Sequence, residues 1–234
     1  MDSKNYAGSE IFQGRSIRSF VLRSGRMSSA QKRSYETLFP LYAARGNEAG
    51  ILESSAVFGN SLPMNIEIGF GMGSATAGIA FNNSEMNYLG IEVHRPGIGR
   101  LLWEIEKLSL KNIRIIEGDA REILKQQIPD KTVSAFHIFF PDPWPKKKHH
   151  KRRLITRPFT DLLAAKLIPG GYIYMVSDWP DYGEWALGEL NATPGLKNKY
   201  GGFAEPQEWR PETEFEKKGR IKNHEIRELF FVRG

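Results

Sequence analysis

The 234-residue sequence contains no cysteine. The absence of thiols excludes disulfide bonds, thiolate-ligated zinc and a cysteine nucleophile, so any chemistry must use other side chains. The sequence also lacks an apolar run that approaches the ~20 residues needed to span a bilayer, which excludes a membrane-spanning helix. Its first residues have neither the basic stretch nor the apolar stretch of a secretion signal, so we expect a cytoplasmic protein.

Negative charge is the smaller share of the charged residues. There are 27 Asp and Glu against 33 Lys and Arg, which gives a formal net charge of +6. Such an excess favours a polyanionic partner, because lysine and arginine displace counterions from phosphates. Many basic proteins bind no nucleic acid specifically, so the distribution of the charge along the chain has to show whether this one does.

Strand-like and helix-like segments alternate from residue 64 onward. The expected strands are 64–68, 88–93, 113–117, 133–140 and 172–177, and the expected helices are 74–81, 98–108, 121–127 and 159–167. This alternation predicts an α/β fold with a doubly wound, mostly parallel sheet of the Rossmann-like kind. Residues 229–232 are expected to add an antiparallel edge strand, and Pro169, Gly170 and Gly171 a turn between helix and strand.

The chain is expected to divide at residue 45. Residues 1–45 are interpreted as a flexible or helical basic extension, and residues 46–234 as one α/β domain. Arginines of the extension either face RNA or form a solvated arm, and their spacing leaves both readings open; they are Arg15, Arg18, Arg23 and Arg26.

A glycine-rich turn follows the first expected strand. Residues 67–73 read Glu-Ile-Gly-Phe-Gly-Met-Gly, and Gly69, Gly71 and Gly73 would let the backbone approach a ligand closely. Ser74 stands where the dinucleotide fingerprint G-x-G-x-x-G requires glycine. The turn therefore disfavours NAD as the ligand without excluding it.

Acidic residues mark three successive strand ends. Glu67 opens the glycine turn, Glu92 ends the next strand where a carboxylate can accept ribose hydroxyls, and Asp119 follows the third strand. Such a rim suits a ligand with a sugar, an adenine and a positive centre, whereas a pyrophosphate would be repelled. S-adenosylmethionine fits that description.

A stiff loop and a basic run follow the fourth expected strand. Residues 141–145 read Pro-Asp-Pro-Trp-Pro and place Asp142 and Trp144 at the mouth of the sheet. The two histidines in the run have no neighbouring partner ligands, so we expect no metal site there. Because the run adjoins this loop, we expect it to contact RNA through Lys146, Lys147, Lys148, His149, His150, Lys151, Arg152 and Arg153.

These motifs together resemble the bacterial single-subunit tRNA (guanine-N7)-methyltransferases. The resemblance runs from about Arg18 to the C-terminus and rests on residues 67–73, 90–94, 139–154, 177–179 and 210–216. It implies a class I methyltransferase that uses S-adenosylmethionine to methylate a guanine in tRNA, guanine 46 of the variable loop. It also implies cofactor contacts by Glu67, Glu92, Asp119 and Asp142, substrate contacts by Lys146 and Asp178, and a guanine site completed by Thr213, Glu214, Phe215 and Glu216.

Two positions depart from the family pattern. Glu214 stands where the family usually has lysine, and Asn223 stands where it usually has glycine. The reversed charge at Glu214 could alter an RNA contact or a salt bridge.

Methylation at N7 of guanine needs no general base, because this nitrogen carries a lone pair and no proton. Asp142 is therefore expected to act by orientation, together with Glu216, by accepting hydrogen bonds from the guanine N1–H and amino group. Alternatively Asp142 caps the following turn, and Trp144 either packs against the sheet or stacks on a flipped base.

Three other functions stay open at this stage. They are an NAD-dependent oxidoreductase, a methyltransferase with a different acceptor, and a non-catalytic RNA-binding module. The sequence does not distinguish a monomer from a homodimer.

Overall fold

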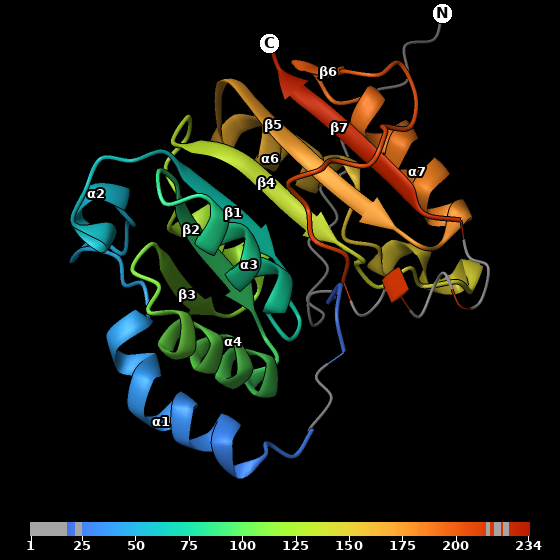
Figure 1. Ribbon diagram of the computed structural model, residues 1–234. Coiled ribbons are helices and arrows are strands. Elements are labelled where there is room, and N and C mark those ends of the chain that lie inside the picture. The colour runs from blue at the N-terminus through green and yellow to red at the C-terminus, as the bar shows by residue number, and fades with distance from the viewer. Residues whose placement is uncertain (1–17, 22–24, 214–215, 218–220, 222–224) are drawn as a thin grey trace, which may run out of the picture.

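The computed structural model describes residues 18–21, 25–213, 216–217, 221 and 225–234. A seven-stranded sheet has the order β3-β2-β1-β4-β5-β7-β6 (Figure 1). Strands β1 to β5 are parallel, as predicted, and the order reverses between β1 and β4, where doubly wound sheets bind ligands. The strands are β1 Met64–Ile68, β2 Asn87–Glu92, β3 Ile113–Glu117, β4 Val133–Phe139, β5 Leu167–Ser177, β6 Leu196–Asn198 and β7 Arg227–Arg233.

Helices cover both faces of this sheet (Figure 1). One face carries α1 Ser29–Tyr42, α3 Ser74–Asn82 and α4 Arg95–Leu108, and the other carries α5 Ala120–Gln126, α6 Arg157–Lys166 and α7 Pro180–Asn191. Because β1 and β2 are covered on both sides, every residue in them is buried, including the polar residues Asn65, Glu67, Asn87 and Glu92. No helix in the described ranges is long and apolar enough to cross a membrane.

Two details of the sheet differ from the sequence-based expectation. Strand β5 begins directly after α6, so Pro169, Gly170 and Gly171 lie inside the strand. They belong to an irregular stretch between the pairs Val133–Leu167 and Ala135–Tyr172, where proline and glycine are tolerated because the ladder is interrupted. The antiparallel strand is β7, but it is not at the edge, because the short β6 pairs on its outer side.

Helix α1 of the expected extension packs against α4. Its start is fixed by a capping box between Ser28 and Gln31. Gly99 of α4 permits the close approach, because a Cβ there would lie 2.5 Å from the Gln31 carbonyl oxygen. After the helix, the amide of Ala44 donates to the carbonyl of Ile115 in β3 at 2.9 Å. This part of the extension is thus joined to the sheet, whereas Arg15 and Arg23 lie outside the described residues.

Candidate active site

The glycine turn connects β1 to α3 at the carboxyl end of the parallel strands. Gly69, Gly71 and Gly73 have φ angles of +74°, +57° and +72°, a region that other residues rarely adopt. An added Cβ at Gly73 would lie 2.6 Å from Cβ of Leu101 in α4, whereas at Gly69 it would enter open space. Glycine at 73 therefore permits close helix packing, and the space beside Gly69 leaves room for a ligand against the backbone.

Glu92 is held at the end of β2 by backbone amides. One carboxylate oxygen accepts from Gly71 N at 2.8 Å, and the other accepts from Val93 N at 2.7 Å and His94 N at 3.0 Å. A carboxylate offers about four acceptor positions, so these three bonds leave room for one further donor. The structure therefore brings Glu92 and the glycine turn together, as the sequence predicted.

Glu67 lies on the same face of the sheet as Glu92. It pairs in register with Gly90, two residues before Glu92, and side chains two residues apart on a strand share a face. Only 4% of Glu67 is exposed. Burial raises the pKa of Glu67 to about 8, and the neighbouring charge of Glu92 adds to this rise. A positively charged group placed beside Glu67 would favour its ionised form.

Asp119 and Asp142 complete a row of carboxylates. Asp119 follows β3 and caps α5, accepting from the amide of Arg121 at 3.0 Å. Asp142 is exposed on the loop after β4, between Phe140 and Trp144, whose φ angles of +51° and +47° are strained for large side chains. Because the strand order is β3-β2-β1-β4, the four acids lie at neighbouring strand ends.

The basic run after this loop forms the 3₁₀ helix η1, Lys147–Arg152. Arg152 lies over the Trp144 ring, 3.9 Å from its centre, and donates to the carbonyls of Arg18 and Phe20 at 3.0 and 3.1 Å. Trp144 Nε1 donates to the carbonyl of Ser19 at 3.1 Å. The Trp144–Arg152 stack thus binds residues 18–21, an arrangement that the sequence did not predict. The exposed members of the run are Lys146, Lys147, Lys148 and Lys151.

The two histidines of the run contact aromatic rings. His149 meets Trp144 edge to face at 5.9 Å between ring centres, and His150 meets Trp185 of α7 at 5.8 Å. Both histidines are partly buried. These contacts pack η1 onto the rest of the molecule and leave part of each imidazole accessible.

The structure contradicts the predicted RNA contact of Arg153. Its side chain is completely buried, donates from Nε to the carbonyl of Pro143 at 3.0 Å, and forms an ion pair with Asp181 of α7. The guanidinium also lies over the rings of Tyr182 and Trp185. A side chain without exposed surface does not reach a phosphate, so Arg153 anchors the loop to α7. A run of like charges gives no sign of which member turns inward.

The predicted guanine site lies partly in the segment between β6 and β7. Thr213 Oγ1 accepts from the amide of Glu216 at 3.1 Å. The Glu216 carboxylate is buried and accepts from Arg210 Nη1 at 2.5 Å. Asp178 directly follows β5, at the same end of the sheet as Asp142. The predicted residues Glu214 and Phe215, and the divergent Asn223, lie outside the described residues.

A buried polar chain behind Glu216 was not predicted. Arg210 Nη2 donates to Glu228 of β7 at 2.7 Å, and the hydroxyl of Tyr174 in β5 donates to the other oxygen of Glu228. One signal was present in the sequence, because Glu228 directly precedes the apolar run 229–232, and an acid drawn into a buried strand requires a partner.

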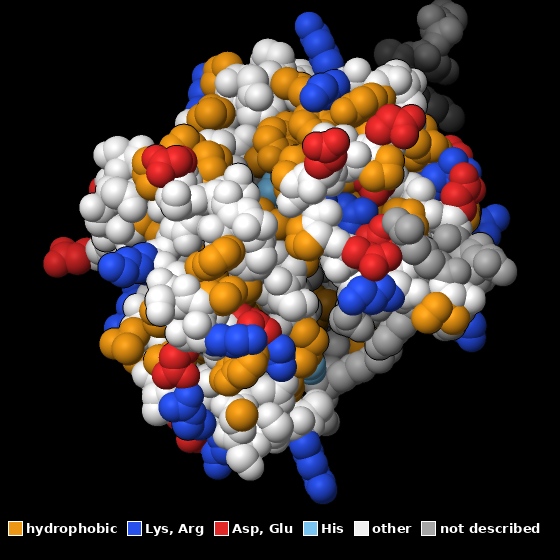
Figure 2. All heavy atoms as spheres, viewed as in Figure 1, with side chains coloured by type: hydrophobic (Ala, Val, Ile, Leu, Met, Phe, Trp, Pro, Cys, Tyr) orange, Lys and Arg blue, Asp and Glu red, His pale blue; other side chains and the backbone are white. Residues whose placement is uncertain are grey.

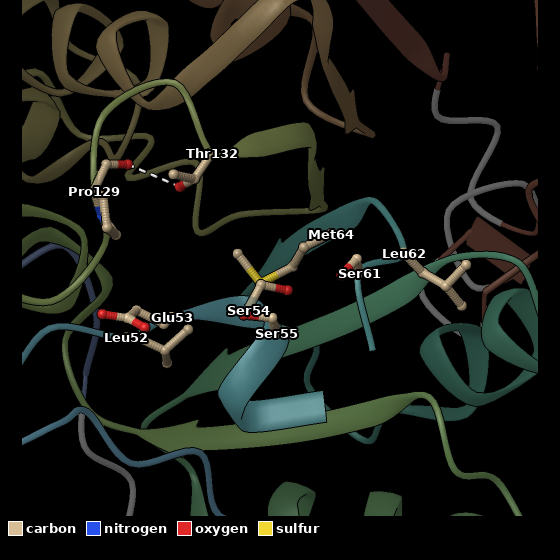
Figure 3. A pocket seen from close by; sticks show the side chains of 9 residues that line it. All are labelled: Leu52, Glu53, Ser54, Ser55, Ser61, Leu62, Met64, Pro129 and Thr132. Carbon is tan, nitrogen blue, oxygen red and sulfur yellow. Dashed lines mark hydrogen bonds between the residues drawn. The ribbon is translucent and has the colours of Figure 1, made fainter. Parts of the chain in front are cut away.

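A separate cavity of about 320 Å³ lies at the opposite end of the strands (Figure 3). Its lining includes Met64, the first residue of β1, and Thr132, which directly precedes β4. Ligands of doubly wound sheets bind at the carboxyl ends of the strands. We therefore assign the candidate active site to the row of carboxylates and not to this cavity.

The fold and the carboxylate-lined end of the sheet define a methyltransferase with the Rossmann-like class I fold. The solved 16S rRNA methyltransferase KamB superposes with a TM-score of 0.58 at 14% identity, covering 82% of this chain and 99% of that one. The antibiotic-resistance methyltransferase Kmr gives a TM-score of 0.53 at 13% identity, covering 81% and 97%. At this level of identity, the similarity shows the fold alone.

Sequence comparison gives the family. A family model described as "Putative methyltransferase" matches residues 61–229. The tRNA (guanine-N(7)-)-methyltransferase of Nitrosospira multiformis is 48% identical, covering 93% of this chain and 94% of the relative. That of Treponema pallidum is 46% identical, covering 94% and 96%. The chain belongs to the tRNA (guanine-N(7)-)-methyltransferase family.

Proposed function

We propose that this protein transfers the methyl group of S-adenosylmethionine to N7 of a guanine in tRNA. The observation that carries this proposal is the row of Glu67, Glu92, Asp119 and Asp142 at neighbouring strand ends, next to the basic helix η1. The family relatives, which are named for this reaction and match over nearly their whole length, support the acceptor.

The residues around the glycine turn fit S-adenosylmethionine. The open space beside Gly69 admits a ligand, Glu92 retains an acceptor position for a ribose hydroxyl, and buried Glu67 favours a positive group. Asp119 is proposed to accept from an adenine amino group. When bound, the cofactor supplies a methyl group activated by a positively charged sulfur. The same carboxylates would repel a pyrophosphate, which disfavours the NAD alternative.

Asp142 and Glu216 are proposed to read the guanine by accepting from its N1–H and its amino group. Asp142 is exposed, whereas Glu216 is buried against Arg210, so its role requires the carboxylate to become accessible when the base enters. Adenine carries no hydrogen at that ring nitrogen, so the pair selects guanine. The N7 lone pair needs no deprotonation, and the rate gain therefore comes from holding N7 in line with the methyl group. As the base becomes positively charged, the two carboxylates also stabilise it.

The tRNA backbone is proposed to bind at η1. On the face seen in Figure 2, basic and acidic side chains are interspersed and form no single positive patch. The basic run, by contrast, contains no acid between residues 146 and 153 and adjoins the Asp142 loop. We place the phosphate contacts on its exposed side chains, namely Lys146, Lys147, Lys148 and Lys151, with His149 and His150 beside them.

The substitution Asp142→Asn tests this function, because it preserves the shape of the side chain and removes its charge. We expect turnover to fall about 100-fold, the order expected when a charged hydrogen-bond partner is lost. The assay is radiolabelled methyl transfer to bulk tRNA followed by nucleoside analysis, with Asp161→Asn on α6 as the matched control. Normal turnover by Asp142→Asn would refute the role of Asp142. Label in a nucleoside other than 7-methylguanosine would refute the reaction.

A further inference from the structure

Four side chains form a continuous buried chain that includes Glu216. Tyr174 donates to Glu228, Glu228 accepts from Arg210, and Arg210 donates to Glu216, with the two arginine bonds at 2.7 and 2.5 Å. The side chains of Arg210, Glu216 and Glu228 are each 3% exposed. The arginine thus lies between two carboxylates, one of which is proposed to bind guanine and the other of which belongs to the sheet.

The chain is anchored at the end of the sheet that carries the active site. Glu228 pairs with Val176, two residues before Asp178. The segment that bears Arg210 is held over the sheet by Trp209, whose ring stacks on His137 at 4.8 Å and contacts Tyr174 at 5.2 Å. Arg210 therefore adds a bond to β7 for a loop that Trp209 already holds against the sheet.

The charge on Glu216 depends on this connection. A carboxyl group so deeply buried would take up a proton without a cationic partner, because burial disfavours the charged form. A protonated acid has one oxygen that donates, so it accepts poorly from two guanine donors at once. Arg210 Nη1 donates to one oxygen of Glu216, and this bond to a cation favours the charged form of the carboxylate.

We propose that Arg210, Glu228 and Tyr174 are positioning residues, which set the charge and orientation of Glu216 and thereby the selectivity for the guanine amino group. This inference rests on the proposed function. Glu228 draws the guanidinium toward β7, and the Tyr174 hydroxyl offsets part of the Glu228 charge. A change at either residue alters how strongly Arg210 neutralises Glu216, although neither residue touches the base.

The test compares tRNA transcripts that carry guanine or inosine at the methylated position. Inosine retains N1–H and N7 but lacks the amino group, so a site that accepts from this group discriminates against inosine. The variants are Glu228→Gln and Tyr174→Phe. The control is Tyr172→Phe on the same strand, whose hydroxyl contacts His137 at 3.1 Å and lies outside the chain.

We expect kcat/KM for the guanine transcript to fall in both variants. The ratio of kcat/KM for the guanine transcript to kcat/KM for the inosine transcript should shrink about tenfold in Glu228→Gln and about threefold in Tyr174→Phe. Tyr172→Phe should retain the wild-type ratio. Equal losses on both transcripts, with an unchanged ratio, would show a merely structural role and overturn the inference. Tyr174→Phe removes a single oxygen, so it decides the question if Glu228→Gln does not fold. Failure of the wild-type protein to form 7-methylguanosine would instead overturn the proposed function.

Discussion

Protonation of Glu67 should be coupled to cofactor binding. Glu67 is buried beside the glycine turn, and burial raises its pKa to about 8. At pH 7 the carboxyl group is therefore mostly protonated when no cation faces it. A ligand that brings positive charge to this position favours the carboxylate, so we expect binding of S-adenosylmethionine to release a proton from Glu67.

The pKa sets the size of the effect. With a pKa of about 8, roughly half of Glu67 is ionised at pH 8 and roughly 1% at pH 6. If binding requires the ionised form, the Kd for the cofactor should rise roughly 50-fold as the pH falls from 8 to 6. At pH 7 about 0.9 proton should be released per bound cofactor.

Titration calorimetry in buffers of different ionisation enthalpy measures both quantities. Glu67→Gln cannot ionise, so its Kd should be nearly constant from pH 6 to pH 8 and its proton release close to zero. The matched control is Glu104→Gln, which alters another buried glutamate, paired with Arg100 on α4. It should retain the wild-type pH dependence. A wild-type Kd that does not change with pH, without proton release, would refute the reasoning.

The same shift also affects stability. Because the folded state holds the Glu67 proton more tightly than the unfolded chain does, the stabilisation present below the ordinary glutamate pKa of 4.5 is lost as the pH rises toward about 8. Measured by thermal unfolding without ligand, the wild-type protein should therefore lose stability relative to Glu67→Gln as the pH rises from 4.5 to about 8. The opposite sign would show that Glu67 is ionised in the folded protein.

Two further predictions concern the basic loop. Arg153→Ala should lower the free energy of unfolding by about 2–3 kcal/mol, because it empties a fully buried site that contacts α7 and removes the bond to the Pro143 carbonyl. Exposed Lys151→Ala should change it by less than about 0.5 kcal/mol. Equal melting temperatures of the two variants would contradict this difference. If the four exposed lysines of the run meet phosphate, the log–log slope of tRNA affinity against salt should be roughly −2.8 to −3.6. A slope near zero would exclude phosphate contact by Lys146, Lys147, Lys148 and Lys151.

The parallel part of the fold could be predicted because it depends on local patterns. Short strand-like runs rich in apolar residues alternate with helix-like segments, and glycine turns and prolines mark where the runs end. The predicted strand 113–117 agrees with β3, and 88–93 differs from β2 by one residue at each end. The position of β7 could not be predicted in this way, because the three residues of β6 that cover its edge are too few to form a pattern.

Only part of the candidate site could be predicted from the sequence, for the same reason. The acids Glu67, Glu92, Asp119 and Asp142 could be placed at one edge of the sheet, because parallel topology brings the carboxyl ends of strands together. The partners of Glu216 could not, since Arg210, Glu228 and Tyr174 come from three separate segments that meet only in the folded chain. Local sequence shows that a buried acid needs a partner but does not show which residue provides it.

Two arginines that the sequence presents as part of charged motifs are used inside the protein. Arg153 forms an ion pair with Asp181 and lies over two aromatic rings, and Arg210 forms ion pairs with Glu216 and Glu228. In each case the guanidinium joins a loop of the active site to an element of the domain, α7 or β7. Arginine suits this task because its planar fork binds several acceptors while remaining charged in a buried position. The basic character of this chain therefore has two physical uses: exposed lysines are available to attract phosphate, and buried arginines fix the loops that carry Asp142 and Glu216.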